Sequence, residues 1–105
     1  DNVKEGMIRE FLAKPIPEGY DSMSLSTRRM WWSGTTQGAT FGPREKVCAL
    51  EIWCECFGGD PRNMKRADSR DINFVLAGME GWQRNKSRRR YGYCGVQRGF
   101  EVIKN

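Results

Sequence analysis

The chain has 105 residues and a formal net charge of +5, which suits one small domain with a hydrophobic core. Residues 82–105 carry +6 and the rest of the chain −1, so the excess charge lies in one segment and favours a polyanionic partner. No apolar run is long enough to cross a membrane and no signal peptide precedes the chain, so we expect a cytoplasmic protein without membrane contact.

Two short helices are predicted near the N-terminus. Residues 3–13 have apolar side chains at helical spacing and stop before Pro15, which disfavours helix in the residue before it. A second helix is predicted over residues 25–32, with Ser24 or Ser26 as its N-terminal cap. We therefore expect a helical arm at this end of the chain.

The segment after the second helix divides the chain. Residues 35–43 are polar and rich in turn-forming residues, which is typical of an exposed loop or linker. This predicts three parts: an N-terminal helical arm over 1–34, the linker over 35–43, and a compact domain over 44–105. Because the first residue is Asp1 rather than Met, we expect the chain to be an excised piece or a processed product of a longer protein.

The compact part is predicted to begin with two helices. Residues 44–57 carry apolar stripes and end before a glycine pair, and Asp60 with Pro61 can start a short helical turn. Residues 68–79 form the second helix, with Asp68 as its N-cap. Its buried stripe is predicted to consist of Ile72, Val75, Leu76 and Met79. Its outward face is predicted to carry Ser69, Arg70, Asn73 and Ala77, with Phe74 nearer the boundary.

An antiparallel hairpin is predicted over residues 82–103. Tyr91, Tyr93 and the apolar residues after them have strand propensity, and Cys94 with Gly95 gives the turn signal. Helix, short helix, helix and hairpin is the order of a winged helix-turn-helix with little or no first strand. The predicted fold is therefore α+β: mainly helical with a β-hairpin, winged-helix-like, and preceded by the helical arm.

The hairpin is the candidate nucleic-acid site because its basic residues have no acid between them and Tyr91 and Tyr93 lie among them. Its predicted phosphate contacts are Arg84, Lys86, Arg88, Arg89, Arg90 and Arg98. On the preceding helix, Ser69, Arg70 and Asn73 are candidates for the major groove, where Arg prefers guanine and Asn adenine. Ordinary exposed helix polarity explains Arg70 and Asn73 equally well.

Several segments resemble the C-terminal end of the virulence-associated protein E family. They are VCALEIWCECFGGDP at 47–61, SRDIN at 69–73, MEGW at 79–82 and YCGVQRGF at 93–100, and residues 51–61 are the most specific. The arm is similar too, through IREFL at 8–12 and PIPE at 15–18. The resemblance implies a phage- or prophage-encoded replication protein with a P-loop, helicase-like ATPase that is often joined to a primase.

The residues of that ATPase have no counterpart in this chain. It contains no GxxxxGK[ST] motif and no acidic metal-binding pair, so we expect a non-catalytic accessory domain without a cofactor. The resemblance implies the ATPase part of the parent protein as a partner, beside the DNA that the basic residues predict. A module for protein interaction or for self-association through the arm is the alternative, and a nuclease is disfavoured because the chain has no His.

The cysteines and tryptophans are predicted to be structural. Cys54 and Cys56 have the wrong spacing for a CxxC site, and no His is present to complete one with Cys48 or Cys94, so we expect neither bound zinc nor a disulfide. The tryptophans are expected to anchor the arm, the core and the base of the hairpin rather than to stack on bases; they are Trp31, Trp32, Trp53 and Trp82.

Overall fold

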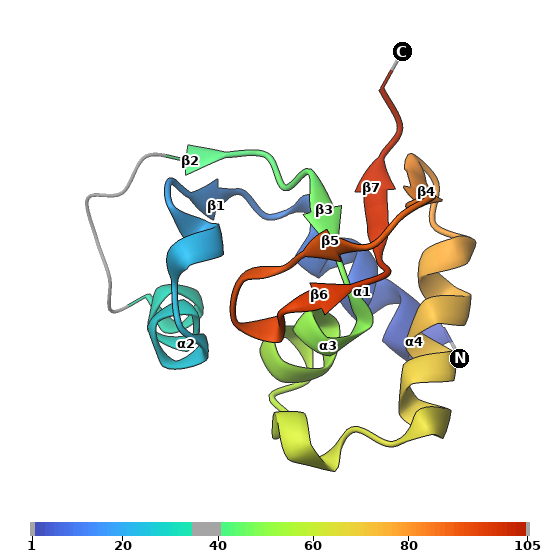
Figure 1. Cartoon of the computed structure of the whole chain (residues 1–105), viewed down its shortest axis with the longest axis horizontal. Helices are drawn as coiled ribbons and strands as arrows, with labels where there is room; N and C mark the ends of the chain where they lie inside the picture. Colours follow the sequence, from blue (N-terminus) through green and yellow to red (C-terminus); the bar gives the residue numbers. More distant parts are fainter. Residues whose placement is uncertain (1, 35–40, 105) are drawn as a thin grey trace.

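The computed structural model describes residues 2–34 and 41–104, and it combines helices with short antiparallel strands. Figure 1 shows the helices below and beside strands that run across the upper part of the molecule. The predicted α+β class is confirmed. Among the described residues, no helix has the length and apolar character needed to cross a membrane.

The N-terminal helices form where the sequence predicts them. Helix α1 spans Asn2–Ala13, and α2 spans Leu25–Ser33. Ser24 caps α2 by accepting a hydrogen bond from the backbone N–H of Thr27, and α2 ends at Gly34, whose φ of 85° suits glycine. Both predictions are confirmed.

Short elements connect these helices to the rest of the chain. Strand β1 (Ile16–Pro17) is followed by the 3₁₀ turn η1 (Tyr20–Ser22), and β1 pairs antiparallel with β2 (Phe41–Gly42). Residues 35–40 of the predicted linker lie outside the described residues. The end of that linker contributes β2, which the sequence did not predict.

The N-terminal helix lies in the main hydrophobic core rather than apart from it. Ile8, Phe11 and Leu12 of α1 are buried in one cluster with Ile52 and Phe100 from the second half of the chain. Phe11 also packs on the half-buried Trp32, with ring centroids 5.2 Å apart. The predicted arm therefore folds back on the C-terminal part of the chain.

The helix predicted over 44–57 is much shorter in the structure. Residues Lys46–Val47 form strand β3, helix α3 covers only Ala49–Glu51, and a π-helical turn, η2 (Ile52–Cys56), continues it. The helix begins late because Val47 pairs with Phe100 of the sheet and the Glu51 carboxylate accepts the backbone N–H of Cys48 at 3.0 Å. The predicted short turn after it is present as η3 (Pro61–Asn63), capped by Asp60.

Helix α4 spans Arg66–Ala77 and begins earlier than predicted. Asp68 is not its N-cap: it lies inside the first turn, where its carboxylate accepts the backbone N–H of Lys65 at 3.0 Å. Ile72 and Leu76 are buried on its inner side, and Val75 is partly buried against the same core, as the stripe predicts. The helix ends at Ala77 and not at Met79, which is buried two residues beyond that end.

The C-terminal strands form the predicted antiparallel hairpin. Strand β4 (Trp82–Arg84) pairs with β7 (Phe100–Val102), and β7 also pairs with β3, which places β7 at the centre of a three-stranded sheet. Between them, β5 (Arg89–Arg90) pairs with β6 (Val96–Gln97) around the 3₁₀ turn η4 (Gly92–Cys94). Trp82, at the start of β4, and Trp53, in η2, both pack against the hydrophobic core, as predicted.

Candidate functional site

The basic residues of the hairpin are on its surface. All six predicted phosphate contacts are exposed: Arg84, Lys86, Arg88, Arg89, Arg90 and Arg98. Arg89 forms an ion pair with Glu101 at 3.2 Å, whereas the other five make no ion pair with any described residue. Side chains alternate along a strand, so Arg90 points to the opposite face of the hairpin from Arg89. The hairpin therefore presents a field of uncompensated positive charge.

The tip of this hairpin is held against the body of the domain. Tyr91 is fully buried, and its hydroxyl accepts a hydrogen bond from Nδ2 of Asn85 at 2.6 Å. Cys94 is buried beside Cys48, and η4 lies against η1. The side chain of Lys46 reaches across to the backbone carbonyl of Arg90 at 2.7 Å. The basic strands thus have a fixed position, which lowers the entropy cost of ordering them on a ligand.

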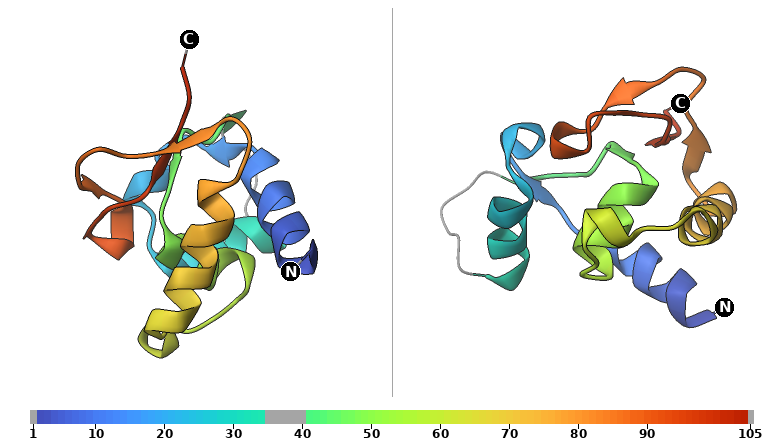
Figure 2. Two further views of the ribbon diagram at one scale, coloured as in Figure 1. Left: turned by 90° about the vertical axis from the view of Figure 1, so that its right-hand side faces the viewer. Right: turned by 60° about the horizontal axis from the view of Figure 1, so that its bottom comes forward.

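The residues predicted on the outer face of α4 are not equally placed. Arg70 is exposed, whereas Ser69 and Asn73 are only half-exposed. The side-chain amide of Asn73 donates to the hydroxyl of Ser69 at 3.4 Å, and its Oδ1 is buried without a partner among the described atoms. Phe74, predicted near the boundary of the core, is 81% exposed. Figure 2 shows α4 between α1 on one side and the hairpin on the other.

Sequence reasoning missed a buried ionic cluster centred on Arg28. This side chain from α2 is completely buried, and its Nη1 donates to Glu51 at 2.7 Å and to Glu55 at 2.9 Å. Its guanidinium lies 3.8 Å from the ring centroid of Tyr20 and 4.8 Å from that of Tyr93, as in cation–π contacts. Arg28 therefore connects α2 to η1, to α3 and η2, and to η4 at the tip of the hairpin.

Glu55 is the acceptor on which the other side chains of this cluster converge. Its Oε1 accepts from the hydroxyl of Tyr20 and from Nε1 of Trp32 at 3.1 Å, and its Oε2 accepts from the hydroxyl of Tyr93 at 2.7 Å. Burial raises the pKa of the Glu55 carboxyl to about 7, and the Tyr93 hydrogen bond opposes that shift. Burial and the neighbouring Glu55 also raise the pKa of Tyr93.

A second buried arginine extends the cluster toward the surface. Arg44 is 4% exposed, donates to the hydroxyl of Tyr20 at 2.9 Å and lies 3.9 Å from the carboxylate of Glu51. Its guanidinium also lies 4.6 Å from the ring centroid of Phe11 in α1. Burial lowers the pKa of Arg44, while Glu51 raises it. Both arginines face the carboxylate of Glu51, so their charge is compensated within the domain.

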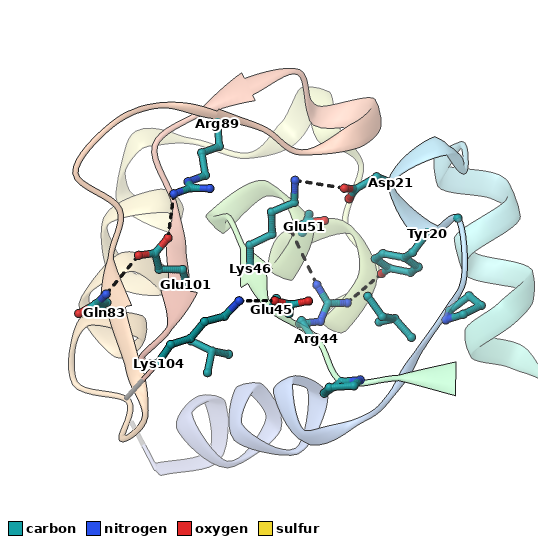
Figure 3. Close-up of a pocket in the computed structure, with 15 residues that line it drawn as sticks. Tyr20, Asp21, Arg44, Glu45, Lys46, Glu51, Gln83, Arg89, Glu101 and Lys104 are labelled. Atoms are coloured by element: carbon teal, nitrogen blue, oxygen red, sulfur yellow. Dashed lines mark hydrogen bonds and ion pairs between the residues drawn. The ribbon is translucent and has the colours of Figure 1, made fainter. Parts of the chain in front are cut away.

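A cavity of about 700 Å³ lies above Arg44, between η1, the approach to β3 and the sheet (Figure 3). Its charged side chains come in pairs whose nitrogen and oxygen atoms are 2.8 to 3.2 Å apart: Lys46 with Asp21, Arg89 with Glu101, and Lys104 with Glu45. Each cation at this rim faces an acid, so the cavity carries no uncompensated charge of the kind found on the hairpin. The pairs instead connect segments that are distant in the sequence.

The cysteines of the described chain are free thiols. The pKa of Cys48 is raised by its contact with Cys94 and by burial, and burial raises that of Cys56 to about 11. These shifts disfavour the thiolate, which is the form that binds metals and acts as a nucleophile. Within residues 2–34 and 41–104, no group of three or more Cys, Asp or Glu side chains is placed to hold a metal ion.

Comparisons with known proteins do not assign the chain to a family. No family model matches the chain, and the search of curated proteins returned no match.

The sequence carried one signal for the buried ionic cluster around Arg28. Glu51 and Glu55 are four residues apart in an otherwise apolar segment, so both carboxylates lie on a buried helix and require cations. The identity of those cations, Arg28 and Arg44, depends on the tertiary structure.

Proposed function

We propose that this chain is a non-catalytic DNA-binding domain of the winged-helix type, belonging to a cytoplasmic, phage- or prophage-type replication protein similar to the virulence-associated protein E family. The order of elements supports this: α1, β3, α3 with η2, α4, β4, the β5–β6 hairpin and β7. The strand order β3-β7-β4 also suits a winged helix, with residues 14–43 inserted after its first helix. The family assignment rests on the sequence segments that resemble it.

The single observation that carries the proposal is the unpaired charge of the hairpin. Five exposed cations that form no ion pair with a described residue lie within residues 84–98, while the buried arginines and the cavity are internally neutralised. A phosphate backbone supplies the missing anions, and the release of its counterions drives such binding. These contacts position a duplex without reading its sequence.

Helix α4 supplies the second part of the proposed interface. Arg66 and Arg70 are exposed on it, and the basic hairpin crosses the molecule beside the C-terminal end of the same helix (Figure 2). An exposed helix fits the width of the major groove, while a flanking hairpin lies along the backbone. In this arrangement the hairpin contributes affinity, and Arg70 contributes any preference for guanine.

The test compares two triple variants of equal charge. The hairpin variant replaces Lys86, Arg88 and Arg90 with Ala, and these exposed side chains make no ion pair with a described residue. The control variant replaces Lys4, Arg9 and Lys14 with Ala, on or just after α1. Both variants lower the net charge from +5 to +2. Fluorescence anisotropy with a labelled duplex, over a salt series, measures the affinity of each.

We expect the hairpin variant to bind at least about tenfold more weakly at low salt and to lose up to about three units of the salt slope. The control variant should keep most of the affinity and slope, because its cations lie across α4 from the hairpin. Equal losses in the two variants would show that only net charge matters. An unchanged affinity of the folded hairpin variant would refute the DNA interface.

One observation favours a second candidate, a module for protein interaction or self-association. A groove of about 210 Å³ between α1 and α4 is lined mainly by apolar side chains, Ile8, Phe57, Ile72, Phe74 and Val75, together with Lys4 and Asp71. The ATPase part of the parent protein or a second copy of the chain would be its partner. Binding to duplex that does not weaken with salt, together with a solution mass above that of one chain, would support this alternative.

A further inference from the structure

Phe74 is the most exposed large apolar side chain among the described residues, at 81%. Phe11 and Phe100 are buried in the core, and Phe57 packs against it. Burial of a phenylalanine side chain gains about 1.5 to 3 kcal/mol, so its exposure in the isolated chain leaves that energy available for a partner.

Phe74 occupies the outermost line of α4. The core residues Ile72 and Leu76 are each two positions away, which places Phe74 on the opposite side of the helix. Arg70 is one turn before it and Arg66 two turns before it, and both are exposed. Residues four apart on a helix have Cβ atoms about 5 to 6 Å apart, so Arg70 and Phe74 form one continuous surface.

This inference rests on the proposed function. We propose that Phe74 contacts the C5-methyl group of thymine in the major groove, beside a base read by Arg70. The thymine methyl is the apolar group that a base pair presents in that groove, and Phe is among the side chains that contact it. Base pairs follow one another at about 3.4 Å, so the two side chains span one or two steps of the duplex.

The chemistry around Phe74 favours DNA over an apolar protein surface. Arg70 lies one turn before Phe74, Arg66 lies one turn before Arg70, and the hairpin adds cations that form no ion pair with a described residue. The exposed Asp71 lies on the other side of Phe74, at the groove between α1 and α4, so the basic flank of Phe74 is the one that carries Arg70. A protein partner that covered Phe74 would have to desolvate Arg66 and Arg70 or provide acids for both. Duplex DNA provides phosphates for the arginines and methyl groups for the ring.

The experiment uses two duplexes that differ only in that methyl group. One is an alternating A·T duplex of 24 base pairs, and the other has deoxyuridine in place of every thymidine, so the phosphates are identical. The full chain should bind the thymine duplex about fourfold more tightly, which is the value of one buried methyl group. Phe74→Ala should bind both duplexes equally, and Phe74→Leu should keep part of the preference because it keeps an apolar side chain.

Each outcome decides the inference. Equal binding of the two duplexes by the parent chain overturns the role of Phe74 but leaves the proposed function intact. A thymine preference that persists in Phe74→Ala overturns it as well. If the folded parent chain binds neither duplex, the proposed function fails together with the inference. If Phe74→Ala lowers the solution mass and leaves the duplex preference unchanged, Phe74 is a protein contact. Because Phe74 is exposed, its substitution should leave the fold intact.

Discussion

Arg28→Met tests whether the buried ionic cluster holds the domain together. Arg28 is completely buried, and the side chains of its partners are 3% exposed for Glu51 and 0% for Glu55. Methionine keeps most of the volume but removes the cation, so two carboxyl groups lose their main counter-charge. The loss of one partner from a buried ion pair costs about 3 to 5 kcal/mol.

This cost is a large part of the total stability. A small domain is stable by about 5 to 15 kcal/mol, and 1 kcal/mol corresponds to about 4 to 8 °C in Tm for a domain of this size. We therefore expect Tm to fall by at least about 12 °C, with a matching loss in urea unfolding. Tryptophan fluorescence is a suitable probe because Trp32 donates to Glu55 within the cluster.

Arg9→Met is the matched control, since Arg9 forms an exposed ion pair with Glu5 at 3.6 Å on α1. Exposed pairs four residues apart contribute about 0.3 to 0.5 kcal/mol, so its loss should be barely measurable. Arg28→Met combined with Glu55→Gln should recover part of the loss, because Glu55 then carries no charge and Glu51 keeps Arg44 as a cation 3.9 Å away. A cost below about 1 kcal/mol for Arg28→Met, or an equal cost for Arg9→Met, would refute the reasoning.

Two further predictions concern stability. Gly99→Ala should destabilise the domain by about 1 to 3 kcal/mol in urea unfolding, because its Cβ would collide with the carbonyl oxygen of Val47 and the hydroxyl of Tyr91. Gly6→Ala should stabilise α1 by about 0.5 to 1 kcal/mol, because its Cβ would have no neighbour within 4 Å. A stabilised Gly99→Ala and a destabilised Gly6→Ala would contradict both predictions. Because the pKa of Glu55 is raised, the folded chain keeps a proton that the unfolded chain releases near pH 4.5. The stability that this proton contributes is complete below pH 4.5 and is lost as the pH rises through about 7. Unfolding free energies measured across that range should fall by up to about 3 kcal/mol. Glu55→Gln, which does not titrate, should remove this part of the slope, and an unchanged slope would count against the assignment.

The parts of the fold that local chemistry determines were predictable from the sequence. The ends of α2 follow from Ser24 and Gly34, whose preferences are local, and the inner stripe of α4 follows from helical periodicity. The antiparallel pairing of β4 with β7 follows from strand propensity on either side of a turn signal.

The errors arose where tertiary contacts override local pattern. Residues 46–47 fit a helical stripe, but they form a strand because their backbone pairs with β7, a contact between distant parts of the sequence. From helical periodicity we also expected Phe74 near the core boundary, although Phe74 lies on the opposite side of α4 from Ile72 and Leu76. Arg28 and Arg44 could not be recognised as buried, because nothing in their own segments identifies Glu51 and Glu55 as their partners.

For the candidate site, the sequence predicted where the positive charge lies but not which of the cations form ion pairs within the domain. The six basic residues of the hairpin are all exposed, yet Arg89 is held by Glu101, a residue of the neighbouring strand. The tip of the hairpin is packed on η1 through contacts between residues about 70 apart in the sequence, so no local pattern reports it.

The central position of β7 has a consequence for synthesis of the protein on the ribosome. Both of its neighbours, β3 and β4, precede it in the chain, so neither can complete its pairing until residues 100–102 have left the exit tunnel. Until then, the apolar side chains that face Phe100 remain uncovered in the nascent polypeptide. Such late, long-range pairing slows folding and prolongs the interval in which chaperones or aggregation compete for the chain.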